Sequence, residues 1–226
     1  MTIKTARIHW DKCWRLIPSR FPTIEVFERV ASQEDFDALY ALESLTNDRL
    51  RQEVGELSLV PPQDRVYGPG SSYIMSAFTH LNPLGSRFSD GTWGVYYAAE
   101  TLETAMAETV YHQESFLRAT DLPPLRIDMR VLVCGLSGEL HDLRDKVYEQ
   151  QGHYHKTSYE ASRRLARSLK EEDSHGIVYW SVRAPQTQNV AVFKPKVLSQ
   201  CRQERHLEYV WDGEKIAHIF EKKAVF

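Results

Sequence analysis

The segment GVYYAAETLETAMAETV, residues 94–110, contains the strand and the helix on which the predicted fold depends. Residues 94–98 are short and apolar, which predicts a buried strand. Thr101 has the side chain of a helix N-cap. After it, apolar and small residues recur at intervals of three and four, as in an amphipathic helix: Leu102, Ala105, Met106, Thr109 and Val110.

Further strands and helices are predicted on both sides of this segment. Apolar and charged residues alternate over residues 125–131, as in a strand with one solvent-facing side. The other predicted elements are short helices or strands at 73–78, 158–169, 176–182 and 190–193, and a hairpin over 207–220 that turns at Asp212-Gly213. Because they do not alternate regularly, they favour an α+β fold with small mixed sheets and flanking helices.

The first sixty residues have the pattern of a separate, mainly helical unit. Residues 10–17 suggest a short strand that Pro18 ends, and Ser32 then begins a helix with acidic residues in its first turn. Pro61-Pro62 marks the expected boundary. We therefore expect an N-terminal extension over residues 1–60 and a second domain over residues 61–226.

Composition excludes several classes of protein. The 226 residues are 42% hydrophobic and 26% charged, which is ordinary for a globular chain with one sizeable core. A formal charge of −3 provides no strong cationic field, which argues against sequence-independent nucleic-acid binding. The chain begins without the apolar region of a signal peptide, and no run reaches the ~20 apolar residues of a membrane helix. Three scattered cysteines indicate reduced thiols, so we expect a cytoplasmic protein.

Four segments carry residues that structure alone does not require. Residues 64–68, DRVYG, contain Arg65 and Tyr67, and residues 85–88, GSRF, place Arg87 in a loop. Residues 95–100, VYYAAE, contain Tyr97 and precede the helix that carries Glu108. Residues 175–183, HGIVYWSVR, form an apolar strand that ends in a serine, Ser181, and an arginine, Arg183.

The order and spacing of these segments over residues 64–195 resemble the RES domain family. Arg87 resembles the family's central arginine, and Tyr97 resembles the aromatic residue at the end of the following strand. Glu108 is similar to the acid eleven residues further on, and Ser181 to the serine after the late apolar strand. In shorter members the early basic residue adjoins its aromatic, whereas Val66 separates Arg65 from Tyr67 here.

The resemblance implies the toxin of a type II toxin–antitoxin system, with a fold similar to ADP-ribosylating toxins and with NAD as its substrate. Most members degrade NAD. A longer subgroup, called ParT, places ADP-ribose on phosphoribosyl pyrophosphate synthetase, and the extra N-terminal residues make this chain resemble that subgroup. The implied partner is an antitoxin of the ParS or Xre type, which carries a DNA-binding domain and blocks the NAD site. Neither a metal nor direct nucleic-acid binding is implied.

The residue types suit cleavage of the nicotinamide–ribose bond, which passes through an oxocarbenium-like state. A carboxylate beside the ribose stabilises that charge or holds the 2-hydroxyl, and we assign this role to Glu108. Guanidinium groups suit the two phosphates of NAD, and Arg65 and Arg87 are the candidates. The remaining candidate contacts are stacking on nicotinamide by Tyr67 and Tyr97 and a hydrogen bond from Ser181 to the ribose or the carboxamide.

Other interpretations remain open at this point. The same site could use water or phosphate as the acceptor, which would make the protein a simple NAD-degrading enzyme. Glu100 and Glu108 could instead be the carboxylate pair of a glycosidase. An inert nucleotide-binding module is a further alternative. His153 and His155, with His141 upstream, lack an acid at fixed spacing, and we interpret their segment as a solvated loop rather than a metal site.

Overall fold

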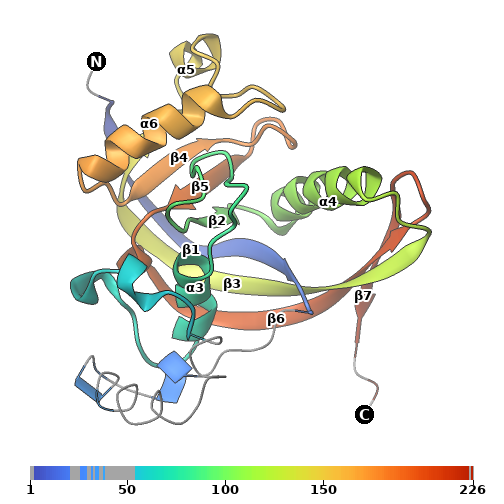
Figure 1. The fold of residues 1–226 in the computed structure, drawn as a ribbon, viewed down its shortest axis with the longest axis horizontal. Coiled ribbons are helices and arrows are strands. Elements are labelled where there is room, and N and C mark those ends of the chain that lie inside the picture. Colours follow the sequence, from blue (N-terminus) through green and yellow to red (C-terminus); the bar gives the residue numbers. More distant parts are fainter. Residues whose placement is uncertain are drawn as a thin grey trace.

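The computed structural model describes residues 3–20, 26–29, 32, 34–35, 38, 54–223 and 225. The strands of this part form one mixed sheet in the order β1-β2-β5-β4-β3-β6-β7 (Figure 1). Their bounds are β1 Thr5–Pro18, β2 Tyr96–Ala99, β3 Leu125–Asp142, β4 Gly176–Trp180, β5 Gln188–Val192, β6 Leu198–Trp211 and β7 Ile216–Lys222.

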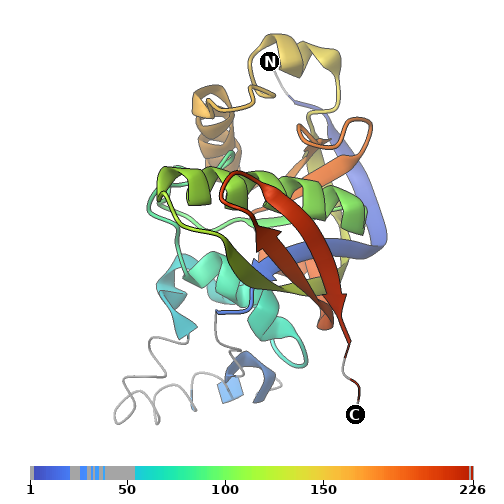
Figure 2. The same cartoon turned by 90° about the vertical axis from the view of Figure 1, so that its right-hand side faces the viewer.

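The sheet closes on itself over five of its strands. β1 pairs with β2 at Trp14 and also pairs with β3 along most of its length, so the order β1-β2-β5-β4-β3 returns to β1. β3 and β4 are parallel, and the other pairs are antiparallel. β6 and β7 extend from β3 as a long twisted hairpin (Figure 2).

Helices cover both faces of the sheet, and each face has its own core. The helices are α3 Ser71–Thr79, α4 Leu102–Ala119, α5 Lys146–Gln150 and α6 Glu160–Glu171, with 3-10 turns η1 Val26–Arg29, η2 Leu57–Leu59, η3 Pro62–Asp64 and η4 Pro195–Val197. Val178 of β4 packs in the cluster that contains α3, and its neighbour Ile177 packs in the cluster that contains α6. Burial on both faces explains why β4 is apolar at consecutive positions. The α+β prediction is confirmed, with the described strands in a single sheet rather than several.

α4 begins where the sequence predicts. The Thr101 side chain accepts a hydrogen bond from Thr104 N at 3.2 Å, as an N-cap does. A third core cluster lies between α4 and strands β1, β3 and β6, and its α4 members are Leu102, Ala105, Met106 and Val110. The Thr109 hydroxyl forms a hydrogen bond with the Tyr209 hydroxyl of β6 (2.8 Å). The helix is thereby fixed across the sheet beside the β6–β7 hairpin (Figure 2).

The expected boundary at residue 60 needs a correction. Residues 5–18 are the strand β1, which pairs with β3 from Thr5↔His141 to Pro18↔Met129 and so belongs to the main sheet. Local sequence pattern does not reveal a partner more than one hundred residues away. Ser32 Oγ accepts a hydrogen bond from Asp35 N (3.2 Å), as expected of an N-cap. The rest of the expected helix through residue 54 lies largely outside the described residues.

The prediction of three free thiols is wrong for two cysteines. Cys134 of β3 and Cys201 of β6 are joined by a disulfide, with their Cα atoms 4.1 Å apart, and Cys13 is buried and free. The pair is 67 residues apart in sequence, which hides the adjacency of their strands. Within the described residues, no helix has the length and apolarity needed to span a bilayer.

Candidate active site

Glu108 lies on the flank of α4 and is held by two side chains from the sheet. Its Oε1 accepts a hydrogen bond from Ser181 Oγ at 2.7 Å and another from Asn189 Nδ2 at 2.9 Å. Ser181 follows the end of β4, and Asn189 lies on the adjacent strand β5. Two of the predicted residues, Glu108 and Ser181, are therefore in direct contact, and one carboxylate oxygen is fixed by two donors.

Ser181 also organises the turn between β4 and β5. Its Oγ accepts hydrogen bonds from Arg183 N (3.2 Å) and Ala184 N (2.9 Å), and its own N–H donates to Thr187 O (2.8 Å). The hydroxyl proton is directed to the Glu108 carboxylate, and the two backbone N–H groups occupy the acceptor side of the same oxygen. Its geometry is that of a group that positions the carboxylate.

Asn189 is a site residue that sequence reasoning did not single out. Its side chain is 3% exposed, and its Oδ1 is buried without a hydrogen-bond partner in the described part of the chain. A buried polar atom without a hydrogen bond lowers the stability of the fold, unless a ligand supplies the missing donor. The available signal was an amide at the start of the apolar run NVAVF, residues 189–193, where a strand core alone would favour a hydrocarbon side chain.

The loop that carries Arg87 is fixed from three sides. Gly85 has a φ of +71°, and a Cβ there would lie 2.5 Å from Ser89 O, so the turn requires glycine. Arg87 is 9% exposed, and its NH1 donates to His153 O and His155 O, both at 3.0 Å. Arg163 of α6 donates to Ser86 O (2.8 Å). Arg163, the first residue of the basic run 163–167, thus holds this loop.

Tyr97 fixes the same loop through its hydroxyl. The hydroxyl bonds Ser86 Oγ at 2.7 Å and accepts a hydrogen bond from Phe88 N at 2.9 Å. Burial raises the pKa of Tyr97 to about 12, although both hydrogen bonds oppose the shift. Its hydroxyl therefore stays protonated at physiological pH and acts as a support for the Arg87 loop.

We expect Tyr97→Phe to lower the free energy of unfolding by ~1–3 kcal/mol, because it leaves Phe88 N–H and Ser86 without their partner. Denaturant unfolding measures the loss. Tyr159→Phe is the matched control: its ring lies under Arg87, 4.6 Å from the guanidinium carbon, and its hydroxyl makes no hydrogen bond within the described residues. The control should change stability by less than ~0.5 kcal/mol. Equal losses in both variants would contradict the support role of Tyr97.

Glu108 and Arg87 share one electrostatic environment. Burial raises the pKa of Tyr179 well above its ordinary value; the Glu108 carboxylate adds to that shift and the Arg87 guanidinium opposes it. Desolvation lowers the pKa of His112, with Glu108 opposing and Arg183 and Arg87 reinforcing the shift. Glu108 and Arg87 thus both act on Tyr179 and His112, while Ser181 holds Glu108 and Tyr97 holds the loop of Arg87.

The RES domain model matches residues 62–212. The chain belongs to the RES domain family. An uncharacterized protein, y4oC, of Sinorhizobium fredii (strain NBRC 101917 / NGR234) is 33% identical over 212 residues, which cover 93% of this chain and 87% of that protein. Among solved structures, the M. tuberculosis MbcT–MbcA toxin–antitoxin complex aligns over 88% of this chain and 86% of the matched chain, with 10% identity and a TM-score of 0.48.

Two predicted residues of the RES domain lie apart from this cluster. Arg65 Nε donates to Val60 O (2.9 Å), and its NH2 reaches Leu57 O (3.4 Å). Tyr67 packs with Phe27, with ring centroids 6.4 Å apart, in the core cluster beneath α3. Within the described residues neither side chain has a hydrogen bond to Glu108, Ser181 or Arg87. The structure therefore gives both residues a role in anchoring the segment before α3.

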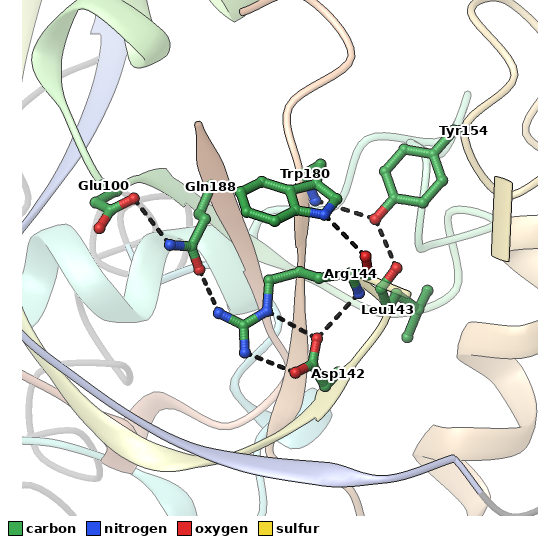
Figure 3. Close-up of polar contacts among 7 residues, drawn as sticks. All are labelled: Glu100, Asp142, Leu143, Arg144, Tyr154, Trp180 and Gln188. Carbon is green, nitrogen blue, oxygen red and sulfur yellow. Dashed lines mark hydrogen bonds and ion pairs between the residues drawn. The ribbon is translucent and has the colours of Figure 1, made fainter. Parts of the chain in front are cut away.

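A second polar network of the RES domain braces the β4–β5 turn from below (Figure 3). Arg144 donates two hydrogen bonds to the Asp142 carboxylate, at 2.8 and 2.6 Å, and a third to Gln188 Oε1 at 2.6 Å. These bonds hold the pKa of Asp142 below its ordinary value. Trp180 Nε1 donates to Arg144 O (2.9 Å), and Tyr154 links Trp180 N to Leu143 O. The residues on either side of the turn, Trp180 and Gln188, are thereby fixed.

The same network separates the two glutamates of the glycosidase alternative. Gln188 Nε2 donates to Glu100 Oε2 (3.1 Å), whereas the next residue, Asn189, donates to Glu108. Consecutive side chains of a strand point to opposite faces of the sheet. Glu100 and Glu108 are therefore held on different faces, which does not suit a carboxylate pair that flanks one glycosidic bond.

The three histidines considered as metal ligands, His141, His153 and His155, form separate hydrogen bonds. His141 Nδ1 bonds Ser174 Oγ (2.8 Å), and His155 Nδ1 accepts hydrogen bonds from Thr157 N and Ser158 N. His153 is buried, with its carbonyl bound to Arg87 and Ser162. Over the described ranges, no three His, Cys, Asp or Glu side chains are grouped as metal ligands.

Proposed function

We propose that this RES domain protein is the toxin of a type II toxin–antitoxin system, which cleaves the nicotinamide–ribose bond of NAD and transfers ADP-ribose to a protein acceptor. Family membership supports NAD as the substrate. The observation that carries the chemistry is the Glu108 carboxylate, whose Oε1 is held by Ser181 and Asn189. By resemblance to the longer subgroup, the acceptor is phosphoribosyl pyrophosphate synthetase.

The geometry assigns a task to each group. With Oε1 fixed, Oε2 of Glu108 is the oxygen that faces the ribose, where its negative charge stabilises the oxocarbenium-like state. Fixing the carboxylate in advance lowers the reorganisation needed at the moment of reaction. The buried Oδ1 of Asn189 is an acceptor for a ribose hydroxyl or for the carboxamide N–H of nicotinamide. Nicotinamide leaves as a neutral molecule, so the site needs no strong general acid.

The proposed partner is an antitoxin with a DNA-binding domain, encoded beside the toxin, that neutralises the toxin by covering the NAD site. This follows from the family resemblance. The surface that such an antitoxin would cover is the edge of α4 and the β4–β5 turn around Glu108 and Ser181.

Incubation of the purified chain with NAD labelled on its adenosine half, with and without purified phosphoribosyl pyrophosphate synthetase, tests this proposal. We expect free nicotinamide and, with the acceptor, a labelled protein band. Free nicotinamide with label only in small molecules would assign the chain to NAD degradation by water or phosphate. Intact NAD in every tube would contradict NAD as the substrate and leave a binding module or a different substrate.

A further inference from the structure

We propose that Arg183 and Arg87 form a clamp for the diphosphate of the dinucleotide, with both guanidinium groups bound to the loop 153–156. The inference rests on the proposed function, since it names the groups that would hold the two phosphates of NAD. Arg183 takes the place of Arg65 in the predicted pair, because the carbonyls that Arg65 binds, those of Val60 and Leu57, belong to residues of the core cluster that contains α3.

Arg183 is tied to the candidate site through its backbone and its side chain. Its N–H donates to Ser181 Oγ, the hydroxyl that also holds Glu108. Its guanidinium carbon lies 3.2 Å from the ring centroid of Tyr111. Tyr111 is three residues after Glu108 on α4, so the two share one helix face. Arg183 is thus placed one helical turn from the carboxylate.

Arg87 has the same kind of surroundings. Its guanidinium lies over the ring of Tyr159 at 4.6 Å, as that of Arg183 lies over Tyr111. Both guanidinium groups bind carbonyls of one loop, residues 153–156: Arg87 NH1 binds His153 O and His155 O, and Arg183 NH2 binds Lys156 O. Stacking and carbonyl contacts hold each planar group in place, so little side-chain entropy remains to be lost when a ligand binds.

The charge of these two arginines is not cancelled. Arg144 is paired with Asp142, and Arg118 with Glu114, but within the described residues neither Arg87 nor Arg183 forms an ion pair with a carboxylate. Carbonyl oxygens satisfy donors without neutralising a cation. Both guanidiniums lower the pKa of His112, so each acts on the same region. In a chain of net charge −3, two uncompensated guanidiniums beside one carboxylate suit a ligand with two phosphates.

Calorimetric titration of the full chain with ADP-ribose and, separately, with adenosine tests the clamp. ADP-ribose carries the diphosphate and is not consumed by the proposed reaction. We expect Arg183→Gln to weaken ADP-ribose binding roughly 10- to 100-fold, the scale of a charge-assisted hydrogen bond, and to leave adenosine binding unchanged. Arg87→Gln should give the same selectivity. Arg183→Lys keeps the charge but loses the planar fork, and should give an intermediate affinity.

Arg118→Gln is the matched control. Like Arg183, Arg118 lies over an aromatic ring (Trp211, 6.0 Å) and donates to a carbonyl (Glu214 O, 2.9 Å). It is at the C-terminal end of α4, the helix that carries Glu108 and Tyr111. It should bind ADP-ribose like the wild type. Wild-type affinity in Arg183→Gln would overturn the clamp and leave the proposed function intact. Equal weakening of ADP-ribose and adenosine would assign Arg183 a merely structural role and overturn it too. If the wild-type chain binds neither NAD nor ADP-ribose, the proposed function falls together with the clamp.

Discussion

Glu108→Gln should reduce the release of nicotinamide from NAD by ~10³-fold or more while the chain stays folded. Glutamine has the size of glutamate and keeps an oxygen that can accept from Ser181 Oγ and Asn189 Nδ2, the two donors that hold the carboxylate. Glutamine lacks the negative charge that stabilises the positive charge on the ribose in the transition state. Removal of a single preorganised electrostatic group costs ~10²–10³-fold in other enzymes, and here the full charge is lost.

The measurement is nicotinamide release under single-turnover conditions, with unfolding by denaturant as a check on the fold. Glu103→Gln is the control, because Glu103 is an exposed glutamate in the first turn of the same helix. The control should retain wild-type turnover, and both variants should stay within ~1 kcal/mol of wild-type stability. Near-normal turnover in Glu108→Gln would show that the carboxylate is not used in the reaction, and the mechanism proposed above would then be wrong.

Local signals explain why part of this site was predictable. The strand 94–98, the Thr101 cap and the apolar spacing after it depend on neighbours within a few residues, and they fix Glu108 on a helix flank. Family spacing then adds Ser181. The contact between Ser181 and Glu108 follows once β4 ends beside α4.

The other features depend on pairings that no local window contains. Asn189 meets Glu108 because β5 pairs with both β2 and β4, with Asn189 opposite Ala99 and Tyr179. Arg65 had the right residue type for a phosphate ligand, but its Nε and NH2 bind the carbonyls of Val60 and Leu57, which lie with α3. Arg183 ends the segment HGIVYWSVR, but its relation to the site depends on its hydrogen bond to Ser181 and its position over Tyr111. Residue type and order thus indicate the chemistry, whereas strand pairing determines which side chains share the site.

Asn189→Asp should make the stability of the protein strongly dependent on pH. The change replaces the donor Nδ2, which lies 2.9 Å from Glu108 Oε1, by a second carboxylate oxygen in a position that is 3% exposed. Two carboxylates at this separation cannot both ionise readily, so they share a proton and the pKa of the pair rises. The unfolded chain releases that proton above about pH 4–5. The folded variant then binds more protons than the unfolded chain, so its stability is present at low pH and is lost as the pH rises through the raised pKa.

The free energy of unfolding, measured in denaturant at pH 5 and pH 8, tests this expectation. Relative to wild type, Asn189→Asp should lose on the order of 2–4 kcal/mol between the two pH values, since each ten-fold change in proton affinity corresponds to ~1.4 kcal/mol. Asn82→Asp makes the same chemical change at an exposed loop position, where water screens the charge. It loses the hydrogen bond from Asn82 Nδ2 to Gly85 O, but its stability relative to wild type should differ by less than ~0.5 kcal/mol between pH 5 and pH 8. A pH-independent loss in Asn189→Asp would mean that residue 189 does not face the Glu108 carboxylate. Burial alone also raises the pKa of a carboxyl, so the contact is tested by the same measurement in a Glu108→Gln background. A smaller slope there would support the Asn189–Glu108 contact without reference to NAD, and an unchanged slope would assign the shift to burial.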